Sequence, residues 1–327
     1  MRRGRLLATT LILALGCDKA RQLAGGSAEA QPAAEQQDGP SVARLDLSSH
    51  PDILFQVYGE RDDPRMIPVG VLRNGTIERI ELGESGWKQF DAMYDKPGAE
   101  YTVYDDGRAV GHATVRQGMW ADGRDPLYTL PNCTLMIPQA AMTLAAQARA
   151  GYTVALFAST RPLHDAGVTR MAQAEVDRIG RDVATRVARS AGIAEAALAS
   201  LELRAVAVAT GVSSESPTIV ASLIDPRADE QSSSREHTVH VFVVADRAGD
   251  GEYKPTYTHV VDGDAATSDF QRFVDHLDVA GDGATELAVE SWRFGGDTFL
   301  TFLEYKNGAW SELYRGRSNW CLDGPSR

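Results

Sequence analysis

Three acidic residues near the carboxyl end of the sequence have the spacing of a loop that could hold a metal ion. Asp278, Asp282 and Glu286 lie in the segment DVAGDGATE at residues 278–286. Carboxylate and carbonyl oxygens are the ligands that Ca²⁺ takes, in sets of about six to eight. Asp and Gly are also the residues of a tight turn between two strands. The segment therefore predicts either a weak calcium site or a turn alone.

The same segment, with the strands expected after it, resembles the acidic loops of FG-GAP and VCBS-type repeats. Those loops follow the pattern Asp-x-Asp-x-Asp-Gly-x-x-Asp/Glu and lead directly into strands. The resemblance implies that Asp278, Asp282, Glu286 and the carbonyl group of Ala284 are calcium ligands. Ala280 stands where the pattern has its second carboxylate, which weakens the implied site. The resemblance covers residues 237–316 at most, so we expect a repeat embedded in another fold rather than a full propeller.

The amino terminus has the three-part layout of a secretory signal. Three arginines precede a largely apolar run at residues 6–15, which is too short to span a bilayer as a helix. The stretch LALGC at residues 13–17 resembles the lipobox of bacterial lipoproteins, in which a small residue precedes the cysteine that receives the lipid. The resemblance implies cleavage before Cys17, lipid on this cysteine and a place in the bacterial cell envelope. Attachment to the inner membrane and to the outer membrane both stay open.

The charge of the chain excludes some partners. The net charge is −12 at pH 7, and it becomes −15 once the signal, with three arginines and no acid, is removed. This acidity argues against nucleic acid as a partner and against adhesion to anionic lipid through a basic patch. The expected partners are the membrane, through the amino-terminal lipid, and an unknown envelope protein or polysaccharide.

Two further cysteines remain once Cys17 is lipidated. Cys133 and Cys321 belong to a protein expected in an oxidising compartment, where such a pair forms a structural disulfide. Separate thiols are the alternative. A redox or nucleophilic role has little support, because neither cysteine lies in a CxxC motif or beside a histidine.

Apolar periodicity and turn signals predict an α+β protein with mostly antiparallel sheets. We expect a signal peptide at 1–16, a lipidated disordered tether at 17–43, a β-rich domain at 44–145 and an α+β domain at 146–327. An apolar stripe between about residues 168 and 190 predicts a long amphipathic helix in the second domain.

Local signals place shorter elements as well. Asn74-Gly75 and Asn307-Gly308 lie between apolar-rich arms and predict hairpin turns, because both turn positions need positive φ. Residues 267–276 are expected to form a short helical piece.

The common catalytic motifs are missing from the sequence. It contains no GxSxG, HExxH, GxxxxGK[ST] or GxGxxG pattern. His164 precedes Asp165 and His276 follows Asp275, and such pairs can orient a base, but no nucleophile is evident beside them. We expect both pairs to lie in solvated loops.

Two functions are compatible with these observations. The first is a non-enzymatic binding or structural module on the cell envelope, favoured by the anchor, the acidic composition and the missing motifs. The second is a hydrolase of an envelope polymer that uses an Asp/Glu pair, whose two carboxylates would face each other across a cleft.

Overall fold

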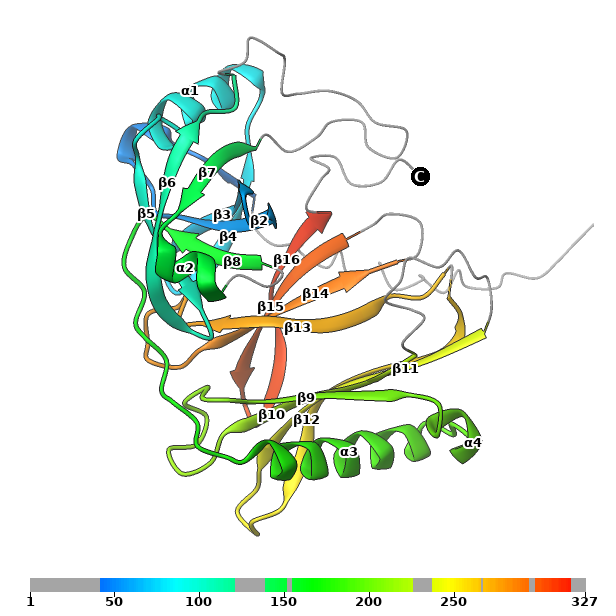
Figure 1. The fold of residues 1–327 in the computed structure, drawn as a ribbon. Coiled ribbons are helices and arrows are strands. Elements are labelled where there is room, and N and C mark those ends of the chain that lie inside the picture. The colour runs from blue at the N-terminus through cyan, green and yellow to red at the C-terminus, as the bar shows by residue number, and fades with distance from the viewer. Residues whose placement is uncertain are drawn as a thin grey trace, which may run out of the picture. The chain divides into compact units, whose positions relative to one another are not determined.

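A computed structural model of the chain describes residues 42–120, 139–151, 155–225, 237–265, 267–293 and 298–318. The predicted signal peptide, nearly all of the predicted tether, Cys17, Cys133 and Cys321 lie outside the described residues. Figure 1 shows the described strands and helices. The helices are α1 (Glu84–Tyr94), α2 (Ala146–Gly151), α3 (Gln173–Ser190) and α4 (Glu195–Leu198), with one 3₁₀ turn at Leu47–Ser49. The strands are β1 (Val42–Arg44), β2 (Ile53–Glu60), β3 (Asp63–Arg73), β4 (Thr76–Glu81), β5 (Glu100–Asp105), β6 (Arg108–Gln117), β7 (Ala140–Leu144), β8 (Ala155–Ser159), β9 (Glu202–Val208), β10 (Thr218–Ile224), β11 (His237–Arg247), β12 (Tyr253–Asp264), β13 (Phe270–Leu277), β14 (Glu286–Trp292), β15 (Thr298–Lys306) and β16 (Ala309–Ser318).

Strands β1 to β8 form one sheet, and six of them close into an antiparallel barrel. The closed order is β3-β2-β8-β5-β6-β7, and β7 pairs again with β3. Along β2, Phe55 and Val57 point into the barrel core, whereas Leu54 between them packs outside it. Trp87 and Phe90 of α1 pack against the same core. Closure pairs both edges of each barrel strand, so the barrel offers no free strand for aggregation.

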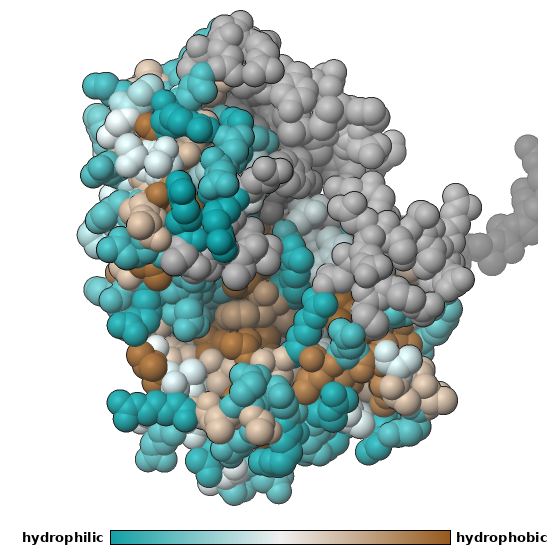
Figure 2. All heavy atoms as spheres, viewed as in Figure 1, coloured by the Kyte–Doolittle hydropathy of each residue, from teal (hydrophilic) through white to brown (hydrophobic). Residues whose placement is uncertain are grey.

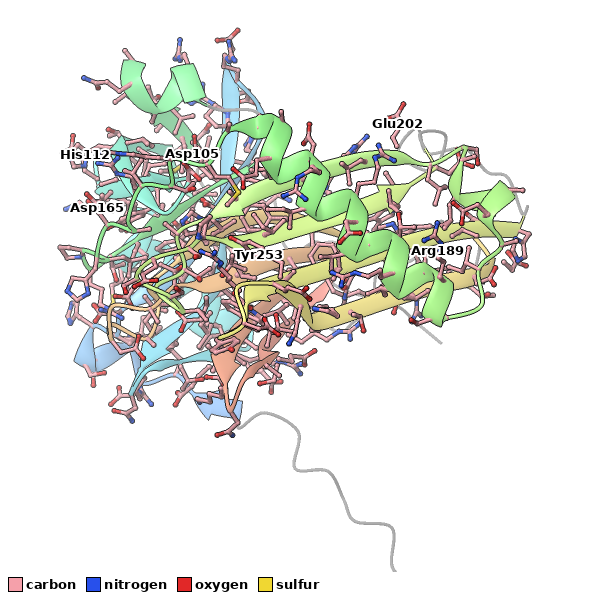
Figure 3. All side chains as sticks on the ribbon, turned by 90° about the horizontal axis from the view of Figure 1, so that it is seen from below. Asp105, His112, Asp165, Arg189, Glu202 and Tyr253 are labelled. Atoms are coloured by element: carbon pink, nitrogen blue, oxygen red, sulfur yellow. The ribbon has the colours of Figure 1, made fainter. Side chains whose placement is uncertain are left out.

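A second sheet, in the order β12-β11-β10-β9, carries α3 on one face. Figure 3 shows the helix lying obliquely across the strands. Val176 and Ile179 of the helix share a hydrophobic cluster with Ala221 of β10. Gly180 allows the close approach, because a Cβ there would meet the Cβ atoms of Ala205 and Ala221 at 2.9 and 3.0 Å.

A third sheet, the antiparallel meander β13-β14-β15-β16, is buried on both faces. Leu287 and Val289 of β14 cluster with Phe242 of the second sheet. Ala288, between them, clusters with Phe157 of the barrel. Because successive side chains of a strand point to opposite faces, the third sheet separates the barrel from the second sheet and packs against each.

One buried carboxylate joins the second and third sheets. Asp246 of β11 is 6% exposed, and its Oδ1 accepts a hydrogen bond from Thr218 Oγ1 at 2.5 Å. Its Oδ2 accepts from Thr256 Oγ1 at 2.6 Å and from Trp310 Nε1 at 2.8 Å. These partners lie on β10, β12 and β16, so the acid is held by donors from both sheets.

The predicted fold class, α+β, is wrong, because the described chain is mostly β. Its helices pack on the barrel or cover one face of the second sheet, and they do not form a helical layer as large as the sheets. Residues 267–276, predicted as a helical piece, contain most of β13, which pairs with β14. A short apolar pattern fits a helix or a strand equally, and here the pairing with a later strand decides.

We expect the substitution Phe302→Ala to lower the free energy of unfolding by about 3 to 5 kcal/mol. Phe302 is fully buried in the third sheet and packs edge-on against Phe157 of the barrel, with ring centroids 5.6 Å apart. Chemical denaturation measures the loss. Lys306→Ala, at the exposed end of the same strand, should change stability by less than about 0.5 kcal/mol; equal effects of the two variants would contradict the described packing.

Candidate functional site

A cleft of about 450 Å³ lies where three loops meet. The loops are residues 160–172 between β8 and α3, residues 209–217 between β9 and β10, and residues 278–285 between β13 and β14. The volume falls within the range of about 300 to 1,000 Å³ that small-molecule sites occupy. The lining mixes polar and apolar side chains, and its polar members include the hydroxyl residues Thr169, Ser213, Ser214, Ser216 and Thr285.

One apolar side chain projects at this cleft. On the face in Figure 2, the described surface is largely hydrophilic and hydrophobic residues gather toward its centre. Val168 lines the cleft, and 66% of its surface is exposed. Among the described residues, it is the one large hydrophobic residue that is mostly exposed. The other large apolar side chains in the described ranges are at least partly buried.

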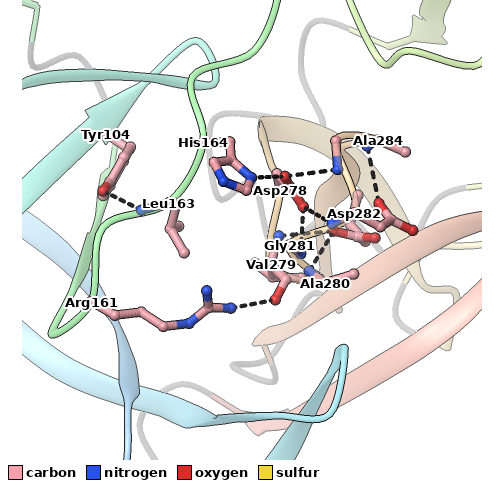
Figure 4. A network of polar contacts seen from close by, with 12 residues as sticks. Tyr104, Arg161, Leu163, His164, Asp278, Val279, Ala280, Gly281, Asp282 and Ala284 are labelled. Carbon is pink, nitrogen blue, oxygen red and sulfur yellow. Dashed lines mark hydrogen bonds and ion pairs between the residues drawn. The ribbon is translucent and has the colours of Figure 1, made fainter.

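Asp278 lines the cleft and is almost fully buried, at 1% exposure. Its Oδ1 accepts hydrogen bonds from the backbone N–H groups of Gly281 and Asp282, at 2.6 and 3.1 Å. Its Oδ2 accepts from the N–H of Gly283 at 3.0 Å and lies 2.8 Å from His164 Nδ1. Figure 4 shows this arrangement, with Asp278 between His164 and the rest of its loop. A carboxylate has about four lone-pair positions, and all of them are engaged here.

His164 is oriented by this contact. A carboxylate oxygen accepts hydrogen bonds, so the contact is made with Nδ1 of His164 as the donor, and in a neutral imidazole this places the acceptor lone pair on Nε2. The His164 side chain is 72% exposed, and the residue lines the cleft. The sequence suggested Asp165 as its partner, but the partner is Asp278, which is distant in sequence. The prediction that His164 lies in a solvated loop agrees with its exposure and missed its buried acceptor.

The segment before His164 is fixed from two sides. Arg161 donates from its guanidinium to the carbonyl oxygen of Val279 at 3.0 Å, and the N–H of Leu163 donates to Tyr104 Oη at 2.7 Å. Figure 4 shows Arg161 reaching toward the Asp278 loop while Leu163 points back to Tyr104. The segment is thereby tied to the barrel and to the third sheet, which positions the histidine between them.

The other predicted calcium ligands turn toward their own loop. Glu286 Oε2 accepts from the N–H groups of Val279 and Ala280, at 2.9 and 3.4 Å. Burial raises the pKa of Glu286 to about 7, and the nearby charge of Asp278 adds to this shift. Asp282 is exposed, and its Oδ1 accepts from the N–H of Ala284 at 3.0 Å.

These residues do not fit a calcium ion. Asp278 has no lone pair left, and Glu286 carries less negative charge near neutral pH than an ordinary glutamate. The described residues contain no group of three or more His, Cys, Asp or Glu side chains able to hold a metal. The affinity of a site for Ca²⁺ increases with the number of charged oxygen ligands that the site provides. We infer that hydrogen bonds from the backbone N–H groups of the loop to Asp278 hold the loop in shape, without a bound ion.

Thr285 lines the cleft and was not suggested by the sequence. The residue is 4% exposed, and its Oγ1 is buried without a hydrogen-bond partner in the described part of the chain. Its N–H donates to the carbonyl oxygen of Thr210 at 3.0 Å, which joins the loops at 209–217 and 278–285. A buried hydroxyl without a partner costs about 1 to 3 kcal/mol. No local motif marks such a residue, because its isolation depends on the packing around it.

A second acid and histidine pair lies outside the cleft lining. Asp275 Oδ1 accepts from the N–H groups of Gly107 and His276, at 3.0 and 2.7 Å, and both residues of the pair are 2% exposed. Gly107 has φ of +69°, and a Cβ there would lie 2.5 Å from His276 Nε2. The prediction of a solvated loop is wrong here, because the pair lies in β13 beneath the β5–β6 turn.

Burial dominates the electrostatics of this pair. It raises the pKa of Asp275 to about 7 and lowers that of His276 to about 4. Both groups therefore favour their neutral forms. This fits a structural joint between the barrel and the third sheet rather than a reactive site.

No protein-family model, curated protein or solved structure matched this chain. None of the described helices is both long and apolar enough to cross a membrane. The function has to be inferred from the chemistry of the chain itself.

Calcium titrated into chelator-treated protein should release no saturable heat, and Asp282→Ala should behave like the parent. Asp278→Ala should lower the free energy of unfolding by about 3 kcal/mol, because three loop amides and His164 lose their acceptor. Calorimetry and chemical denaturation provide the two measurements. One-site heat that disappears in Asp282→Ala would restore the calcium site.

The variant Asp275→Asn should remove part of the pH dependence of stability. A carboxyl whose pKa is raised by folding stabilises the protein fully below its unfolded pKa of about 4 and loses this effect as pH rises through about 7. The variant should therefore gain on the order of 2 to 4 kcal/mol relative to the parent between pH 4 and pH 8. Denaturation midpoints across this range measure the gain, with Asp62→Asn as control, because the Asp62 side chain is 89% exposed and faces an arginine. A constant difference between parent and Asp275→Asn would refute the assignment.

Proposed function

We propose that this chain is a lipid-anchored bacterial envelope protein whose folded part is a non-enzymatic binding or structural module. The anchor rests on the charged start, the short apolar run and the LALGC stretch that ends at Cys17. An acidic surface is not attracted to anionic headgroups, so the amino-terminal lipid has to provide the attachment to the membrane.

The cleft at His164 and Asp278 is the observation that carries the binding role. It is concave, of ligand size, lined by both polar and apolar side chains, and built from three loops that connect elements of the β framework. Sites of this kind on loops over a rigid scaffold are the usual location of binding surfaces.

The acids of the cleft favour binding over hydrolysis. A glycoside hydrolase needs one carboxylic acid with a raised pKa beside the substrate. The carboxyl groups whose pKa burial raises to about 7, Asp275 and Glu286, do not line this cleft. Asp278 does line it, but its oxygens are already engaged. An Asp/Glu hydrolase would have to rely on Asp165 and Glu215, so it stays the second candidate.

The third sheet supports the proposed relation to FG-GAP and VCBS-type repeats in architecture alone. It is a four-stranded antiparallel meander whose acidic loop joins its first two strands. A four-stranded sheet is the unit of a propeller blade. In this chain the meander packs between a barrel and another sheet, so we propose a single embedded repeat that has lost its ion.

Labelled palmitate should be incorporated into the protein in a bacterial host that processes lipoproteins, and the protein should sediment with membranes. Cys17→Ser should lose the label and be released, because the acyl chains supply the attachment. Cys133→Ser, which keeps the predicted lipidation site, should retain the label and serves as control.

Persistent membrane attachment of unlabelled Cys17→Ser would overturn the proposed anchor. Turnover of purified cell-wall polymer that is lost in Asp165→Asn or Glu215→Gln would overturn the non-enzymatic role and establish the hydrolase.

A further inference from the structure

The side chains around the cleft indicate the charge of its ligand, provided that the cleft binds one as proposed above. Asp165 Oδ1 accepts from the N–H of Ala109 at 2.8 Å, which leaves Oδ2 available. The Glu215 carboxylate makes no hydrogen bond or ion pair with the described residues. These two acids are the lining carboxylates that can still accept hydrogen bonds, since Asp278 cannot.

The balance of charge in the lining is negative. The three carboxyl groups of Asp165, Glu215 and Asp278 outnumber the basic groups of the lining, which are the Arg170 guanidinium and the His164 imidazole. The whole chain is acidic as well, with a net charge of −12. A negative cleft in an acidic protein repels phosphate and other anions and raises the local concentration of cations.

The remaining lining narrows the kind of cation. Trp, Tyr and Phe are absent from the described lining, so it has neither the aromatic cage that recognises quaternary ammonium groups nor a platform for sugar rings. A primary ammonium group, by contrast, has three donors for carboxylate oxygens. The Ser and Thr hydroxyls can donate to peptide carbonyl groups, and Thr285, whose buried Oγ1 has no partner among the described residues, belongs to the same lining.

We propose that the cleft binds a short peptide through a primary ammonium group, with Asp165 and Glu215 as the acceptors. The ammonium group can be the amino terminus or the side chain of a basic residue, which share the same chemistry. Val168, exposed at the cleft, then contacts the apolar part of the bound peptide.

Calorimetric titration with tri-alanine tests the α-ammonium group, and titration with N-acetyl-lysine amide tests the side-chain ammonium group. N-acetyl-tri-alanine amide, which has no charge, is the reference ligand. We expect at least one ammonium probe to bind and the reference not to bind. Glu215→Gln should weaken binding about tenfold, the scale of one charge-assisted hydrogen bond. Thermal unfolding of each variant confirms that it remains folded.

Glu202→Gln is the matched control, because it makes the same charge change on exposed β9. Figure 3 shows Glu202 well separated from Asp165. Equal weakening by both variants would reduce the effect to overall charge and overturn the inference. Equal binding of the uncharged reference would also overturn it while leaving the cleft as a binding site. No heat with either ammonium probe would overturn the inference. Turnover of cell-wall polymer is a different result, and it would overturn the proposed non-enzymatic function.

Discussion

The two-sided burial of the third sheet is the constraint on which the described fold depends. Leu287 and Val289 face the second sheet, and Ala288 faces the barrel, so each strand supplies two hydrophobic contacts at once. Such a sheet tolerates neither a shift of register nor a polar side chain without a partner. Asp246 shows how the requirement is met, since two threonine hydroxyls and the Trp310 indole satisfy its carboxylate.

The same constraint explains why the Asp278 loop is built as it is. The loop connects two strands that are buried on both faces, so its acids cannot all remain in water. Asp278 and Glu286 are buried and accept hydrogen bonds from backbone N–H groups of the loop, which replaces part of the hydration that the carboxylates lose. In a calcium loop the ion would organise these groups, whereas here the backbone amides and His164 organise Asp278. The cleft beside the loop follows from this arrangement, because His164 is held at its edge.

Local chemistry in the sequence predicted local structure well. Asn74 and Gly75 have φ of 51° and 74°, as a tight hairpin turn requires, and they join β3 to β4. The Asn307-Gly308 turn joins β15 to β16 in the same way. These predictions succeeded because the conformation of a two-residue turn is decided by the residues in it.

The features that the sequence did not predict all depend on distant partners. Residues 267–276 form strand rather than helix because β14 pairs with them. Barrel closure depends on β3 and β7, and the orientation of His164 depends on Asp278. Burial of His276 depends on the β5–β6 turn that covers it. Thr285 became a candidate binding residue only because its buried Oγ1 has no hydrogen-bond partner among the described residues. Sequence periodicity gives no information about such a missing partner.

The position of the third sheet in the chain has a consequence for the order of folding. Its four strands follow the barrel and the second sheet in sequence, so they leave the ribosome or an export channel after both. Until they arrive, the outer face of the barrel around Leu54 and Phe157 and the inner face of the second sheet around Phe242 both lack their cover. Two incomplete parts must therefore wait with apolar surface exposed, which is the condition under which nascent chains aggregate or recruit chaperones. Completion of the last meander buries both surfaces in one step, which makes folding of the described part cooperative from its carboxyl end.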